Sequence, residues 1–152
     1  MSGVVLPALI LRWCHIVPAV VAGGATVYTF LALIPALGEL PAAEAARLRE
    51  AVVRRWRVVF MVCVTLLLAS GLLNFLLYQS PAHRGQALYH GIFGIKFLAA
   101  LVVFFLGSAL TGRSAALAQI RANARFWTGV SAALVILIVL LSGILRGIPA
   151  AN

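Results

Sequence analysis

The chain has 152 residues, of which 64% are hydrophobic and 10% are charged, and its formal net charge is +9. Its mean hydropathy of +1.11 excludes an ordinary soluble domain and indicates an integral membrane protein whose main partner is the lipid bilayer. The basic residues lie mostly beside apolar blocks and are not interleaved with aromatic residues on a soluble face, so no nucleic-acid partner is expected.

Four apolar blocks, separated by three polar breaks, are each long enough to cross a hydrocarbon core, which needs about 20 residues. They cover about residues 6–37, 56–78, 86–111 and 126–148. The first block is too long to cross upright and is expected to tilt, protrude or kink, with Pro18 and Pro35 as natural positions for a kink. The sequence therefore predicts an all-α fold, a single domain over residues 1–152 that forms a bundle of four transmembrane helices.

The first polar break, residues 39–55, holds all three acidic residues, Glu39, Glu44 and Glu50, interleaved with arginines. Pro41 suits the first turn of a helix, and the alanine-rich stretch after it favours helix. We expect a cytoplasmic helical connection that faces the lipid headgroups and leads directly into the second span.

The arginines are distributed unequally between the two ends of the spans. Only Arg12, Arg84 and Arg146 lie toward one side, whereas eight flank the first and third breaks: Arg47, Arg49, Arg54, Arg55, Arg57, Arg113, Arg121 and Arg125. The positive-inside rule places the eight-arginine side in the cytoplasm, and both termini and the connection at 79–86 outside. This N-out, C-out topology suits a multi-pass protein of a bacterial inner (cytoplasmic) membrane.

Three ionisable residues fall inside predicted spans: Arg12, His15 and Lys96. His15 is nine residues into the first span (15 − 6) and Lys96 is ten into the third (96 − 86), and these spans run in the same direction. The two side chains should therefore lie at similar depth in the outer half of the membrane. Asn74 of the second span, with Ser70 one turn before it, should lie close to the same level. Intramembrane ionisable groups are costly, so this level is the candidate site.

Arg12 and His15 are three residues apart and share a helix face with the small residues Ala19, Ala22 and Gly23. Small residues leave room for a flat ligand or for a close neighbouring helix. An imidazole can ligate haem iron while an arginine neutralises a propionate, so haem is one interpretation. The other is that His15 only hydrogen-bonds a neighbouring helix.

The remaining polar residues have alternatives of their own. Lys96 could extend its ammonium to the outer interface. His83 is expected in the outer loop and His90 at the interface, so neither is favoured as a ligand.

Copper is the rival metal, with Cys14, His15, Met61 and Cys63 as its candidate ligands. Cys14 and His15 belong to the outer half of the membrane, whereas Met61 and Cys63 enter the second span from the cytoplasmic side. They should not converge, and the two cysteines are expected to stay unpaired.

Three stretches carry a family resemblance: "RWCHIVPAVVAGG" in the first span, "LLASGLLNF" in the second and "GIKFLAALVVFFLG" in the third. With them the chain resembles the four-helix membrane superfamily of CopD-like (copper resistance D) domains and HemJ-like protoporphyrinogen oxidases. In the HemJ-like group a histidine and a lysine at the positions of His15 and Lys96 are associated with haem binding and activity. The CopD-like pattern is the better match and implies copper handling or a redox role.

The sequence thus predicts a small membrane protein that binds a redox cofactor, b-type haem, in electron transfer or in haem or copper handling. His15 would be the axial ligand and the metal-binding residue, Arg12 a propionate partner, and Lys96 and Asn74 further polar contacts of the cofactor. Two alternatives stay open. One is a non-catalytic accessory subunit of a larger membrane complex or of a homo-oligomer, and the other is a copper transport component.

Overall fold

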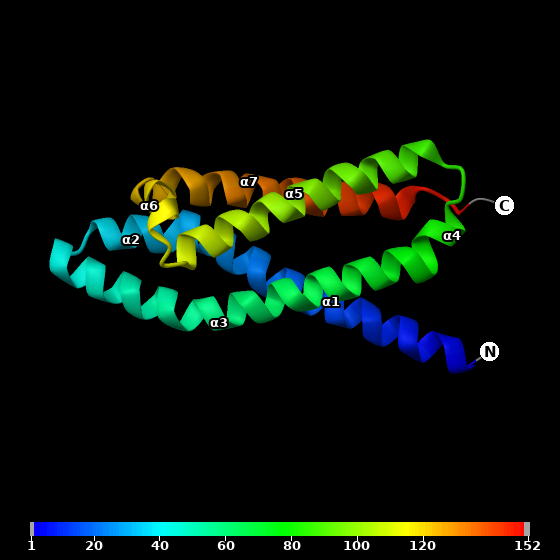
Figure 1. Ribbon diagram of the computed structural model, residues 1–152, viewed down its shortest axis with the longest axis horizontal. Helices are drawn as coiled ribbons and strands as arrows, with labels where there is room; N and C mark the ends of the chain where they lie inside the picture. Colours follow the sequence, from blue (N-terminus) through cyan, green and yellow to red (C-terminus); the bar gives the residue numbers. More distant parts are fainter. Residues whose placement is uncertain (1, 151–152) are drawn as a thin grey trace.

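The computed structural model describes residues 2–150, and these form an all-helical bundle (Figure 1). The first long helix comprises α1 (Ser2–Tyr28), the π-helical segment η1 (Thr29–Leu33) and α2 (Ile34–Gly38), and the second comprises α3 (Ala42–Asn74), the π-helical segment η2 (Phe75–Gln79) and α4 (Ser80–Ala82). The third is α5 (Ala87–Thr111), and after the short η3 (Ala115–Leu117) and α6 (Ala118–Ala122) the fourth is α7 (Ala124–Gly147).

Four of these helical stretches are long and apolar enough to cross a membrane: Leu6–Gly38, Ala42–Ala82, Ala87–Thr111 and Ala124–Gly147. The all-α fold is therefore confirmed, and the four helices have the length and composition of a multi-pass membrane protein. The first break is helical from Ala42, directly after Pro41, and it continues into the second span as expected. The second connection is shorter than expected, because Ser80–Ala82 continues the helix and only residues 83–86 link it to α5.

Each π-helical segment ends two residues before a proline, since Leu33 precedes Pro35 and Gln79 precedes Pro81. A proline in a helix has no N–H to donate, and its ring clashes with the carbonyl four residues earlier, so a wider turn relieves the contact. Pro18 lies inside α1 without interrupting it. The irregularity of the first span is therefore found before Pro35 and not at Pro18.

The helices pack most extensively in two pairs, α1 with α3 and α5 with α7, while α1 also contacts α7 and α3 contacts α5. Figure 1 shows α5 and α7 side by side. It also shows α1 crossing α3, with the amino-terminal part of α1 diverging from the bundle. The interior is narrow and built from residues such as Phe60, Leu106 and Ala109, whereas many large apolar side chains face outward. This is the pattern of helices that meet lipid on most of their surface.

The first and last described residues and the connection at residues 83–86 lie at one end of the bundle, and the two breaks with eight arginines lie at the other (Figure 1). Because eight arginines face three, we expect reporter fusions at Leu40 and Arg113 to give a cytoplasmic signal and a fusion at Gly85 an external one. Paired phosphatase and fluorescent-protein fusions measure this. An external signal at Arg113 would invert the expected topology.

Candidate functional site

His15 is joined to the second long helix where α1 crosses α3. Its Nδ1 lies 3.0 Å from the hydroxyl oxygen of Ser70, which is only 3% exposed. The Ser70 hydroxyl donates its single hydrogen to the carbonyl oxygen of Leu66 at 2.5 Å. With the Ser70 hydrogen on Leu66, we assign the His15 tautomer that donates from Nδ1 and keeps the lone pair on Nε2.

Gly71 gives the His15 ring its position against α3. A Cβ atom at residue 71 would lie 2.9 Å from Cε1 and 3.3 Å from Nδ1 of His15. Real Cβ contacts are almost never that short, so only glycine lets the ring lie flat on the backbone of α3. Of the two polar residues expected at this level of the second span, Ser70 and Asn74, Ser70 is the one that contacts His15. The adjacent Ser-Gly pair in "LLASGLLNF" was the available signal, because it offers a hydroxyl and an open backbone together.

The other predicted site residues are distributed around this contact. Lys96 is half-buried on α5 and makes no side-chain hydrogen bond within the described residues. Asn74 is half-buried and Arg12 is exposed, and within residues 2–150 neither side chain makes a hydrogen bond. The structure thus brings His15 and Ser70 into contact, and it leaves Arg12 and Asn74 unpaired.

The small residues that follow His15 on its helix face allow α1 to approach α7. Ala22 is buried, and a Cβ at Gly23 would lie 3.1 Å from Cγ1 of Val135 on α7. The sequence left two explanations for these small residues, a flat ligand or a close neighbouring helix. At Gly23 the space is taken by α7, so a flat ligand would have to lie elsewhere against His15.

His83 lies in the connection at residues 83–86, as expected, and its side chain is buried there. The side chain is 6% exposed and stacks on Tyr89 with ring centroids 3.7 Å apart. Its Nδ1 lies 3.0 Å from the Gln79 carbonyl oxygen and its Nε2 3.4 Å from that of Ile148. Both ring nitrogens face carbonyls, so His83 ties the end of α7 to the connection between the second and third spans.

The candidate copper ligands do not converge in the structure. Cys14 is exposed, Cys63 is buried and both are free thiols, which confirms the expectation that they stay unpaired. Among the residues whose placement is described, no group of three or more histidine, cysteine, aspartate or glutamate side chains could hold a metal ion.

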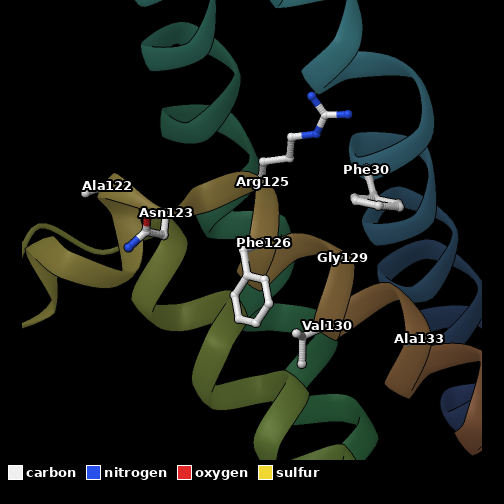
Figure 2. Close-up of a pocket in the computed structure, with 8 residues that line it drawn as sticks. All are labelled: Phe30, Ala122, Asn123, Arg125, Phe126, Gly129, Val130 and Ala133. Carbon is white, nitrogen blue, oxygen red and sulfur yellow. The ribbon is translucent and has the colours of Figure 1, made fainter.

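Two cavities lie toward the arginine-rich end of the bundle. One, of about 770 Å³, lies between the first helix, α3, α5 and α7, and it extends from Phe60 and Val103 to Arg49 and Arg125. The other, of about 720 Å³, lies between Phe30 of η1 and the start of α7 (Figure 2). Sequence reasoning found neither, because their walls come from separate helices.

We expect His15 and Lys96 to be energetically coupled. The double variant His15→Ala with Lys96→Met should differ from the sum of the single variants by about 0.5–3 kcal/mol in unfolding free energy, because neighbouring groups couple. Thermal unfolding in detergent measures this. The control cycle combines Lys96→Met with Thr128→Ala, because Thr128 is buried near the other end of the bundle and should not couple to Lys96. If the losses of unfolding free energy were additive in both cycles, Lys96 would not be coupled to His15.

The chain finds no match among protein-family models, curated proteins or solved structures. The resemblance to CopD-like and HemJ-like proteins therefore stays an expectation that rests on the three quoted stretches, and the fold and the geometry around His15 carry the functional argument.

Proposed function

We propose that the protein binds a b-type haem through Nε2 of His15 and works in electron transfer or in haem or copper handling within the membrane. The observation that carries the proposal is the direction of the His15 hydrogen bond. The ring donates from Nδ1 to Ser70, whose own hydrogen goes to Leu66, so Nε2 offers a lone pair in a fixed orientation.

Histidines that bind metals almost always donate their other ring N–H to a nearby acceptor, which fixes the tautomer and the ring plane. Ser70 is that acceptor here, and the bare backbone at Gly71 holds the ring from one side. The donor set therefore fits axial ligation of haem iron from one face. When bound, the haem would supply a one-electron redox couple, and the axial imidazole would tune its potential.

Two cations suit the remaining polar groups of a haem. Arg12, one turn before His15, is exposed and has no hydrogen-bond partner within the described chain, so its guanidinium is free to pair with a propionate. Lys96 of α5 would be a second polar contact.

The absorption spectrum of the purified protein tests this proposal. We expect a Soret band, an α-band in the reduced-minus-oxidised difference spectrum and about one haem per chain. A colourless protein after expression with sufficient haem supply would contradict haem binding. A colourless protein that retains stoichiometric copper would favour the copper alternative.

A non-catalytic accessory subunit is the second candidate, and the shape of α1 favours it. The amino-terminal part of α1 diverges from the other helices, and Leu6, Ile10 and Trp13 on it are exposed (Figure 1). A larger membrane complex or a second copy of the chain could cover this part. Purification from native membranes in mild detergent, followed by mass spectrometry, would reveal a stoichiometric partner.

A further inference from the structure

The 770 Å³ cavity has an apolar interior. Phe60 of α3 and Val103 of α5 are buried in its wall, at 2% and 7% exposure. The hydroxyls of Thr26, Thr111 and Ser131 also line it, and each donates its hydrogen to the carbonyl four residues earlier on its own helix, at 2.8 to 2.9 Å. The lining hydroxyls of Tyr28, Thr29 and Thr128 make no hydrogen bond within the described residues.

The mouth of this cavity is basic. Arg49 of α3 and Arg125 of α7 line it and are exposed, and Figure 2 shows the Arg125 side chain extending from α7 toward the gap between the first helix and α3. Within residues 2–150, Arg125 has no hydrogen-bond or ion-pair partner, and Arg49 only reaches the Arg121 carbonyl at 3.4 Å. No described residue that lines either cavity is acidic.

Two other arginines at this end are already engaged. Arg57 donates to the carbonyl oxygen of Thr111 from Nε at 2.9 Å and from Nη2 at 2.5 Å, and Arg121 donates to that of Ser114 at 2.7 Å. They stabilise the connection after α5. Arg49 and Arg125 are thus the cavity arginines whose charges stay available to an anion.

The second cavity shares Arg125 with the first. Its 720 Å³ are lined mainly by apolar groups, among them Phe30, Phe126 and Val130 (Figure 2). Phe30 packs on the bare backbone of α7, because a Cβ at Gly129 would lie 2.8 Å from its ring. An acidic group at Arg125 would therefore have two separate apolar hollows within reach.

We propose that the two cavities bind one anionic diacyl phospholipid of the surrounding membrane, with its phosphate between Arg49 and Arg125 and one acyl chain in each hollow. Both volumes lie within the about 300–1,000 Å³ of ordinary ligand sites. The charge of the mouth is complementary to an acidic headgroup, and the arginine-rich end of the bundle lies where lipid headgroups lie.

Native mass spectrometry of the purified protein in a neutral detergent tests this, with dioleoylphosphatidylglycerol, dioleoylphosphatidylcholine and oleate as probes. We expect one phosphatidylglycerol adduct at about tenfold lower lipid concentration than phosphatidylcholine, because each basic residue strengthens binding of an anionic lipid. The double variant Arg49→Gln with Arg125→Gln should lose about tenfold in this binding.

The matched control is Arg54→Gln with Arg55→Gln, which removes the same charge from exposed arginines that line neither cavity. It should change binding by less than about threefold. Ala25→Leu, which narrows the larger cavity, should weaken binding more than Ala36→Leu on the same long helix, outside the lining. His15→Ala should leave the adduct unchanged, which separates this site from haem binding.

Equal binding of phosphatidylglycerol and phosphatidylcholine, or an equal loss in both arginine pairs, would overturn the proposal in favour of diffuse attraction. Oleate that binds as tightly as phosphatidylglycerol would overturn the assignment of a diacyl lipid and point to a free fatty acid.

Discussion

Replacing His15 with alanine is expected to abolish haem binding, with complete loss of the Soret band from the purified protein. The imidazole is the axial ligand in the proposed site, whereas His83 faces backbone carbonyls with both ring nitrogens and His90 faces one with Nε2. The measurement is the haem-to-protein ratio, taken together with far-UV circular dichroism to show that the helices persist.

His90→Ala is the matched control, because it removes an imidazole from α5 without touching the proposed ligand, and it should retain the haem. Ser70→Ala should give an intermediate result, with haem affinity about 10–100-fold weaker. Without the hydroxyl that accepts from Nδ1 of His15, neither the tautomer nor the orientation of the ring is fixed. Full retention of haem in His15→Ala would refute the assigned ligand, whereas equal loss in His90→Ala would indicate a general effect on folding.

The second large effect is expected at Gly107, where α5 passes over α3. An added Cβ would lie 2.7 and 2.8 Å from ring carbons Cε1 and Cε2 of Phe60, so this buried ring would have to shift toward the larger cavity, whose wall it forms. Gly107→Ala should therefore lower stability by about 1–3 kcal/mol, the usual cost of overpacking, partly offset by the better helix propensity of alanine. The midpoint of thermal unfolding should fall by several degrees.

Gly94→Ala provides the control, since Gly94 lies on the same helix and an added Cβ there meets nothing within 4 Å. Its unfolding midpoint should stay the same or rise slightly. The double variant Phe60→Leu with Gly107→Ala should recover part of the loss, because the smaller side chain vacates the space. Identical midpoints for Gly107→Ala and Gly94→Ala would show that α3 and α5 do not pack as described.

The sequence was sufficient for the number and approximate length of the spans. A bilayer accepts only segments of about 20 apolar residues whose backbone groups are all bonded internally, so four apolar blocks become four helices. Counting residues from the span ends predicts that His15 and Lys96 lie at one depth, because each helical residue adds a fixed rise. The shared depth stays a prediction.

Only the tertiary structure decided which faces meet. The spans are apolar on all sides, so their sequences do not reveal how each helix is rotated or which neighbour it contacts. For this reason the sequence did not reveal the contact of His15 with Ser70 and Gly71, the burial of His83 within its connection, or the basic-mouthed cavity. Close approach at Gly23, Gly71 and Gly107 sets these rotations, because packing between membrane helices depends on where a missing side chain lets two backbones meet.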